Sequence, residues 1–131
     1  MIGAGLLLDT HTAIWWWTDP TRIGKNALSV LNDGEAPIFV SPVSAIEIAI
    51  KFRIGKLSDF GNPALDFPAL MARNRFLSLP ITESHALSAG LLPGSHRDPF
   101  DRLIAAQALI EGLTVATCDG EFASFGCKTI W

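Results

Sequence analysis

The sequence has few of the residues that mark secreted or membrane proteins. Its two cysteines, Cys118 and Cys127, are too few for a disulfide framework in 131 residues, and neither has a second metal ligand at CxxC spacing. No apolar run reaches the roughly 20 residues that a membrane span needs. The N-terminal apolar stretch has no basic start and Asp9 interrupts it, which argues against a signal peptide. We therefore expect a reduced, soluble, cytoplasmic protein that does not enter a membrane.

Charge is also scarce. Charged residues make up 18% of the chain and hydrophobic residues 49%, a balance that argues against disorder and for a dense core. With no repeat, low-complexity segment or linker, residues 1–131 fit one domain. Ten Lys and Arg face 13 Asp and Glu, a net charge of -3, so the overall basic excess of many nucleic-acid-binding proteins is missing. A local basic stripe is still compatible with this acidic total.

Short apolar segments alternate with longer helical segments along the chain. Strands are predicted at 6–8, 38–40, 76–81, 113–117 and 128–130. Helices are predicted at 10–18, 21–32, 42–55, 62–74, 82–92, 98–111 and 119–125. The strand segments lack period-two alternation, which is typical of a parallel sheet buried on both faces. We expect an α/β three-layer sandwich, with a mainly parallel central sheet of four to five strands and helices on both faces.

Three helices begin with recognisable capping signals. Ser41 and Asp98 each precede a proline, and a polar cap followed by proline at the first helical position is a favoured way to start a helix. In the 62–74 helix we expect Asp66 to be the cap, with Pro68 in the first turn.

Four acidic residues are expected to meet at one edge of this sheet. Asp9 directly follows the first strand, and Asp119 lies two residues beyond the strand at 113–117. Asp101 is in the first turn of a helix whose preceding loop crosses the same edge, and Glu47 is in the helix after the second strand. Sites in open parallel sheets form outside the carboxyl ends of the strands, so all four side chains can converge there.

Each of these residues also has a simpler interpretation. Asp9 and Asp119 would equally serve as helix caps, and Asp101 would stabilise a helix dipole. Glu47 is harder to explain because it lies in an almost wholly apolar run, and an unpaired Glu is rarely buried. In the simpler interpretation Glu47 pairs with Lys51, one helical turn later, in an ion pair worth about 0.3 kcal/mol if exposed.

A divalent cation would explain why several carboxylates gather at one place. Carboxylates forced together repel, and some take up protons unless a cation compensates them. A set of oxygen ligands suits Mg²⁺ or Mn²⁺ rather than zinc, and such an ion orients a phosphate and activates water for in-line attack. The histidines are not at ligand spacing, and we expect His11 and His96 to lie at the surface or in supporting positions near the site.

Four segments match a known family in order. They are LLLDTH at 6–11, SPVSAIEI at 41–48 followed by Lys51 and GKL at 55–57, HRDPFDRLIAAQA at 96–108, and LTVATCD at 113–119, with a closing Ile130–Trp131. In these segments, which span essentially the whole chain, the protein resembles the PIN-domain ribonucleases, and within them the VapC-type toxins of bacterial toxin–antitoxin pairs. The third segment is the most specific.

The resemblance implies a fold, an activity and partners. The fold is a parallel sheet between helices, and the activity is hydrolysis of RNA phosphodiester bonds with Mg²⁺ or Mn²⁺, leaving 5′-phosphate and 3′-hydroxyl ends. The partners are a cognate antitoxin, a second copy in a homodimer, and operator DNA bound through the antitoxin in a larger complex. The family's acidic residues fall on Asp9, Glu47, Asp101 and Asp119, and a supporting hydroxyl falls on Thr117. We expect the adjacent Thr10 to support the site through its hydroxyl or its backbone.

Three other functions are compatible with parts of the sequence. A catalytically silent PIN scaffold that binds RNA or protein is the main alternative, and the complete acidic quartet argues against it. A receiver-like phosphoacceptor domain needs a second acid after the first strand, whereas Thr10 and His11 follow Asp9. A nuclease that cuts DNA stays open, because a metal site does not itself select the sugar.

Basic residues near the acidic positions are candidates for RNA contact. Lys51, Arg53 and Lys56 cluster at the end of the 42–55 helix, and Arg97 and Arg102 flank Asp101. These side chains would guide the RNA backbone towards the site. The alternatives are a solvated helix end, or neutralisation of a site carboxylate by Lys51.

Three consecutive tryptophans form the remaining feature. Helical residues advance by about 100°, so Trp15, Trp16 and Trp17 cannot share one narrow face. We expect one or two to pack on the sheet and another to face solvent unless a partner covers it. A larger core, a partner interface and stacking of RNA bases are all consistent with this run.

Overall fold

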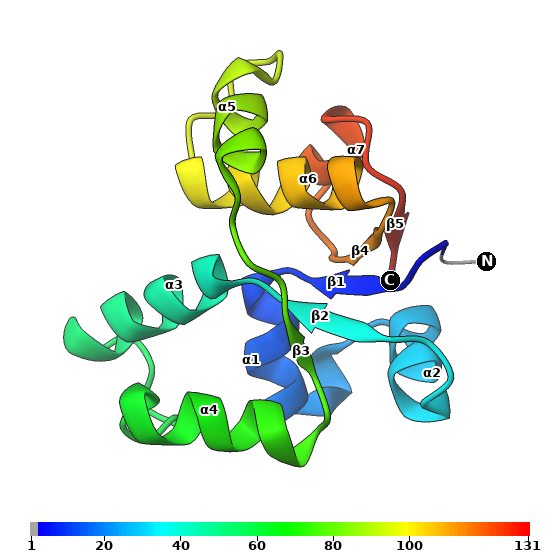
Figure 1. Ribbon diagram of the computed structural model, residues 1–131. Coiled ribbons are helices and arrows are strands. Elements are labelled where there is room, and N and C mark those ends of the chain that lie inside the picture. Colours follow the sequence, from blue (N-terminus) through cyan, green and yellow to red (C-terminus); the bar gives the residue numbers. More distant parts are fainter. Residues whose placement is uncertain (1–2) are drawn as a thin grey trace.

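The computed structural model describes residues 3–131, which form a parallel sheet covered by helices on both faces (Figure 1). The strands are β1 (Leu6–Leu8), β2 (Ile38–Val40), β3 (Leu77–Ser78), β4 (Thr114–Ala116) and β5 (Thr129–Ile130). Their order is β3-β2-β1-β4-β5, and every neighbouring pair is parallel. In the central register, Leu7 pairs with Phe39 on one side and Val115 on the other. The predicted α/β sandwich is confirmed.

The sheet extends from β1 on both sides. It first builds β2 and β3 on one side of β1, and later builds β4 and β5 on the other side. The boundary between β1 and β4 is therefore the point where the strand order reverses, and ligands of open parallel sheets bind outside the carboxyl ends of the strands at such a point.

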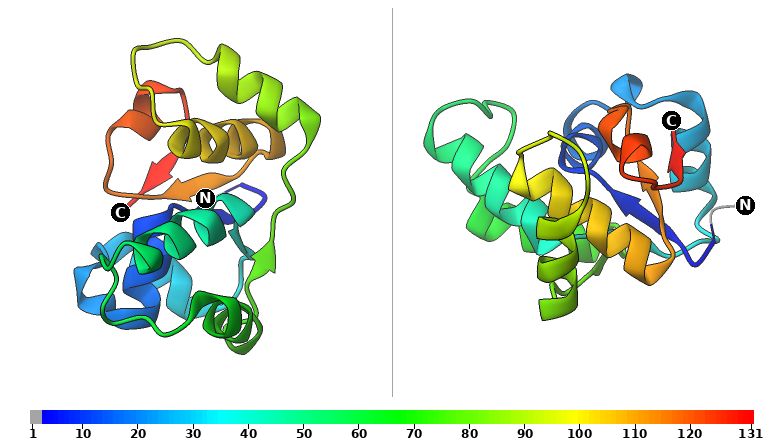
Figure 2. Two further views of the ribbon diagram at one scale, coloured as in Figure 1. Left: turned by 90° about the vertical axis from the view of Figure 1, so that its left-hand side faces the viewer. Right: turned by 90° about the horizontal axis from the view of Figure 1, so that it is seen from above.

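Helices form the two outer layers. On one face lie α1 (Thr10–Thr18), α2 (Lys25–Asp33) and α4 (Pro63–Arg73), and on the other lie α5 (Glu83–Leu91), α6 (Pro99–Glu111) and α7 (Glu121–Ser124). The helix α3 (Pro42–Arg53) extends outward from the sheet edge, and a short 3₁₀ helix, η1 (Pro20–Arg22), follows α1. Figure 2 shows the same layers from two other directions.

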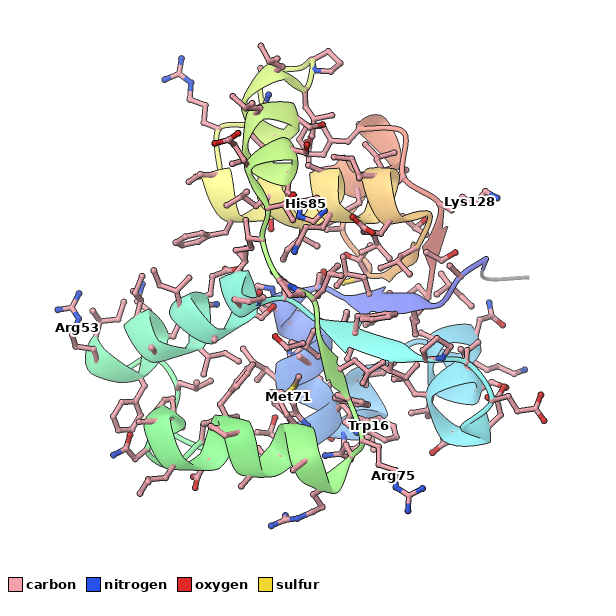
Figure 3. The ribbon with its side chains drawn as sticks, viewed as in Figure 1. Trp16, Arg53, Met71, Arg75, His85 and Lys128 are labelled. Carbon is pink, nitrogen blue, oxygen red and sulfur yellow. The ribbon has the colours of Figure 1, made fainter. Side chains whose placement is uncertain are left out.

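The two faces of β1 hold separate parts of the core. Leu6 and Leu8 pack with Met71 of α4, which points from α4 into the molecule in Figure 3. Leu7 packs on the opposite face with residues of α6 such as Ile104. All three β1 leucines are fully buried, because side chains that alternate between two covered faces leave no position for a polar residue.

A third cluster fixes the position of α3. Ile14 of α1, Ile48 of α3 and Phe60 in the segment after α3 are buried together. Ile48 is fully buried and directly follows Glu47, so its packing fixes the turn of α3 that carries this carboxylate.

Two of the three predicted caps are confirmed. The Ser41 side chain accepts a hydrogen bond from the Val43 N–H at 3.0 Å, and the Asp98 side chain accepts one from the Phe100 N–H at 2.9 Å. The prediction for Asp66 is wrong. Asn62 caps α4 instead, which places Pro68 inside the helix rather than in its first turn. Asn62 followed by Pro63 is the same signal of a polar cap and a proline that begins α3 and α6.

Several predicted elements are shorter than expected. The helix predicted at 21–32 is divided, with η1 at its start and α2 beginning only at Lys25 after Gly24. A Cβ on Gly24 would lie 2.4 Å from the backbone carbonyl carbon of Trp131, so this position is closely approached by the chain end. The strand predicted at 76–81 shortens to β3, and the helix predicted at 119–125 shortens to α7.

All three tryptophans of α1 are half-buried. Trp16 donates a hydrogen bond to the Asn74 side chain at 3.0 Å, and the Trp17 ring packs against Phe67 and other aromatic rings. Trp15 contacts His11, Arg22 and Trp131 instead. None of the three rings is fully exposed or fully buried, so each keeps part of its surface open to solvent.

Two further sequence features have structural counterparts. Cys118 and Cys127 are both free thiols, and burial raises the pKa of Cys127 to about 11. Within residues 3–131, the helices are all too short or too polar to cross a membrane.

Candidate functional site

Asp9 lies buried at the carboxyl end of β1. One carboxylate oxygen, Oδ1, accepts the Thr12 N–H at 2.8 Å and so caps α1. The Thr12 hydroxyl lies 3.0 Å from the same oxygen and 2.8 Å from the Ala116 carbonyl, so its single proton serves one of the two at a time. The other oxygen of Asp9 is directed towards β4. Asp9 is therefore a helix cap and a site candidate at once.

Thr117 connects Asp9 to Asp119. It follows β4, and its buried hydroxyl donates a hydrogen bond to Oδ2 of Asp9. The same hydroxyl oxygen accepts the Asp119 N–H at 3.0 Å. Asp119 is exposed, and its Oδ1 accepts the Glu121 N–H at 2.9 Å. One threonine thus fixes the relative placement of two acidic residues from neighbouring strands.

Glu47 is held from α1 rather than by its own helix. The Thr10 hydroxyl donates to Oε1 of Glu47 at 2.6 Å and lies 2.9 Å from the Ser44 hydroxyl, which therefore donates to Thr10. The Lys51 ammonium donates instead to Nε2 of His11 at 3.3 Å. Among residues 3–131, no carboxylate lies within ion-pair distance of Lys51, so the simple pair with Glu47 is not formed.

Asp101 lies near two further polar side chains. His96 donates from Nε2 to Oδ2 of Asp101 at 3.0 Å, and the capping residue Asp98 lies one turn earlier. Potential ligand atoms of His96, Asp98 and Asp101 all lie within 4.8 Å of one another. Within the described chain, this is the only group of three or more acidic, histidine or cysteine residues that is so tightly spaced.

The pKa shifts show that these carboxylates act on one another. Burial raises the pKa of Glu47 despite the hydrogen bond from Thr10, and the negative charges of Asp101 and Asp98 raise it further. Burial also raises the pKa of Asp101 despite its bond to His96, and Asp98 and Asp119 add to that rise. The pKa of His96 is raised mainly by its hydrogen bond to Asp101.

The structure thus brings the four predicted acidic residues to one edge of the sheet, which we call the acidic rim (Asp9, Glu47, Asp101 and Asp119). Electrostatic interactions connect Glu47, Asp101 and Asp119, and Thr117 connects Asp9 to Asp119. The four carboxylates are more widely spaced than the His96 group, so the rim is an open arrangement rather than a closed cage.

The residues predicted to contact RNA differ in their surroundings. Arg102 is better explained as a structural residue, because its Nε donates to the Ala89 carbonyl at 2.9 Å and its two terminal nitrogens donate to the carbonyls of His96 and Leu92. This network holds the segment that precedes α6. Arg53 points outward at the far end of α3, as Figure 3 shows. Lys51 remains close enough to Glu47 to lower its pKa.

Sequence reasoning missed some supporting residues. Ser44 precedes Glu47 by three residues and so shares its helix face, and Thr12 follows Asp9 at the spacing of a capping interaction. These spacings were available in the sequence as signals. His96 was expected at the surface or in a supporting position, and it takes a supporting one on Asp101. Its direct bond had no spacing signal, because it depends on the path of the loop before α6.

Comparison with known proteins gives consistent results. A family model described as the PIN domain matches residues 6–126. Ribonuclease VapC22 of Mycobacterium tuberculosis (strain ATCC 25618 / H37Rv) is 31% identical over 120 residues, which cover 91% of this chain and 90% of that protein.

Two solved structures share the fold. VapBC2 from Rickettsia felis, bound to a DNA fragment from its promoter, superposes with a TM-score of 0.70 at 17% identity, over 95% of this chain and 96% of that chain. FitAcB from Neisseria gonorrhoeae superposes with a TM-score of 0.62 at 21% identity, over 96% of each chain. The match of the family model over residues 6–126 shows that the chain belongs to the PIN-domain family.

Proposed function

We propose that this protein is a metal-dependent endoribonuclease and the toxin of a toxin–antitoxin pair. The observation that carries the proposal is the acidic rim, in which Thr117 joins Asp9 to Asp119 while Thr10 directs Glu47 to the same edge. The relative Ribonuclease VapC22 supports RNA as the substrate. The structural neighbours, which include toxin–antitoxin complexes, support an antitoxin as partner.

The donor set fits a hard divalent cation. The rim offers carboxylate and hydroxyl oxygens, which suit Mg²⁺ or Mn²⁺. Burial is the main cause of the raised pKa values of Glu47 and Asp101, and neighbouring carboxylates add to it, so a bound cation would favour the ionised form of both. Asp9, Asp101 and Asp119 would hold the ion directly or through water, and Glu47 would complete the set. When bound, the cation supplies neutralisation of charge on the phosphoryl oxygens.

Glu47 has the properties of a residue that orients and deprotonates the attacking water. Its pKa is raised, which brings a carboxylate closer to the range in which a general base works efficiently at neutral pH. The Thr10 hydroxyl fixes one carboxylate oxygen and leaves the other for water. Attack by water on the phosphorus, with departure of the 3′-oxygen as the leaving group, would give 5′-phosphate and 3′-hydroxyl ends.

Exposed apolar side chains support the proposed protein partners. Ile46, Phe52 and Ile54 are exposed on or just after α3, and Leu87 and Leu91 are exposed on α5. Such side chains are typical of surfaces that other chains cover. A second copy in a homodimer and a cognate antitoxin would account for them, and operator DNA would then be bound through the antitoxin.

The test is cleavage of total RNA by the purified, antitoxin-free chain. We expect cutting with Mg²⁺ or Mn²⁺, none with EDTA, and product ends that ligate as 5′-phosphates. Asp9→Asn and Asp101→Asn should each lower the rate by about 100-fold or more. Asp33→Asn, which removes a carboxylate at the end of α2, is the matched control and should cut normally. A folded wild-type chain that binds RNA without cutting it would instead be the silent scaffold.

A further inference from the structure

We propose that a basic groove beside the acidic rim binds the phosphate backbone of the RNA strand, an inference that rests on the proposed ribonuclease function. The groove has a volume of about 380 Å³ and lies between α1, η1 and the end of α3. Its charged and aromatic lining consists of His11, Trp15, Arg22, Lys51, Lys56 and Asp59.

The groove concentrates positive charge in an acidic protein. Arg22, Lys51 and Lys56 contribute three cations, against the single carboxylate of Asp59. Among the described residues, no carboxylate oxygen lies within 4.0 Å of a nitrogen of these three side chains. Arg22 and Lys56 are exposed. Their charges are therefore available to an external anion, although the whole chain carries a net charge of -3.

Two of the three cations, Arg22 and Lys51, contact rings of the groove. The Arg22 guanidinium lies 4.6 Å from the centre of the Trp15 ring. The His11 ring lies 5.7 Å from Trp15 and accepts the hydrogen bond from Lys51. Trp15 also contacts Trp131 at 5.9 Å, so both its neighbours and its half-buried position suit a support for Arg22 better than a platform for a base. The groove thus presents two positioned cations and the exposed Lys56, an arrangement that suits phosphates.

The groove lies beside the acidic rim, although none of the four rim carboxylates lines it. His11 directly follows Thr10, which donates to Glu47, and Lys51 lies one turn beyond Glu47 on α3. An RNA strand with one phosphate at the rim would therefore place neighbouring phosphates along the groove. This arrangement also explains how an acidic protein would attract RNA, because contacts to phosphates dominate nucleic-acid affinity and need only local positive charge.

The experiment measures binding separately from cleavage. A fluorescein-labelled single-stranded RNA of mixed sequence is titrated with protein in EDTA, and anisotropy gives Kd at several salt concentrations. The test variant Arg22→Gln/Lys56→Gln keeps long side chains and removes two charges. Lys51 is left intact because its charge also acts on Glu47. The control Lys25→Gln/Lys128→Gln removes two exposed charges outside the groove, and Figure 3 shows Lys128 far from the end of α3.

We expect the groove variant to raise Kd on the order of tenfold at low salt and to flatten the slope of log K against log salt by roughly 1.4, since each phosphate contact to a single strand adds about 0.7. The control should change neither value beyond a small uniform effect. Asp59→Asn, which removes the groove's carboxylate, should tighten binding, and thermal melts of each variant would show that it is folded.

Three results would overturn the inference. They are equal binding by the groove variant and wild type, equal losses in the groove and control variants, and binding of polyglutamate as tight as that of RNA, which would make the groove a site for an acidic peptide. These outcomes do not depend on catalysis. A wild-type chain that fails to cut RNA with Mn²⁺ would defeat the proposed function, whereas one that cuts RNA but ignores the groove charges would defeat only this inference.

Discussion

The hydroxyl of Thr117 donates a hydrogen bond to the carboxylate of Asp9, which lies 108 positions earlier in the chain. The same oxygen accepts the backbone N–H of Asp119 at 3.0 Å. Asp9 and Asp119 are therefore placed relative to each other by a residue that carries no charge. The acidic rim depends on such hydroxyls as much as on its carboxylates.

Thr117→Val should weaken metal binding without removing a ligand. The valine keeps the shape of the side chain but cannot hold Asp9 or accept from Asp119, and loss of a supporting contact of this kind typically lowers metal affinity about 10–100-fold. Calorimetric titration with Mn²⁺ measures the change. Thr117→Ser should restore most of the affinity. Wild-type affinity in the valine variant would show that the hydroxyl does not organise the site.

Thr10→Val should move the pH dependence of cleavage. Thr10 donates to the ionised carboxylate of Glu47 and so lowers its pKa, in opposition to the burial that raises it. Removal of the hydroxyl should raise the pKa of Glu47 further and shift the acidic limb of the pH–rate profile to higher pH. Thr10→Ser is the control that keeps the donor. An unshifted acidic limb in the valine variant would separate Glu47 from the titration that limits the rate.

In the metal-free protein at neutral pH, the ionised Glu47 should lower the free energy of unfolding. The pKa of Glu47 is higher in the folded chain than its ordinary value of 4.5, so its ionisation disfavours folding. This unfavourable contribution is absent below the ordinary pKa, grows as the pH rises, and is complete above the folded pKa. Glu47→Gln should therefore raise Tm in EDTA at pH 7.5 more than at pH 4. An equal change at both pH values would contradict this sign.

Two glycines should respond in opposite directions to alanine. At Gly24 the added Cβ would lie 2.4 Å from the Trp131 carbonyl carbon, and such overpacking costs about 1–3 kcal/mol. At Gly90, within α5, nothing lies within 4 Å of the added Cβ, so alanine should stabilise the helix by roughly 0.5–1 kcal/mol. Urea denaturation compares the two variants with wild type. Similar effects at both positions would mean that the chain end does not pack on Gly24.

Local signals predicted much of this structure. The bounds of β1 and α1 follow from the leucine run, the acid that ends it and the proline that stops the helix, and the caps Ser41 and Asp98 follow from the prolines after them. The Asp66 prediction failed because a nearer signal of the same kind, Asn62 before Pro63, competes for the helix start.

Contacts between distant segments could not be predicted in the same way. The sequence predicts Arg102 to be a surface cation beside Asp101. In the structure its guanidinium donates hydrogen bonds to the carbonyls of Ala89 and His96 instead. Arg22 was not predicted to contact RNA. Only the packing of η1 against α1 brings it into the same groove as Lys51 and Lys56. The neighbouring positions of Asp9 and Asp119 could be predicted from the strand ends, because parallel topology brings those ends together whatever the loops do.

The central claim is that the carboxylates of the acidic rim act as one metal-dependent nuclease centre. The most direct measurement is the rate of RNA cleavage with Mn²⁺ by Asp9→Asn, by Asp101→Asn and by the variant that combines them. Residues that act as a unit give strongly non-additive losses, so the combined variant should be little slower than either single variant. Single losses that multiply, or cleavage that persists in all three variants, would contradict the account.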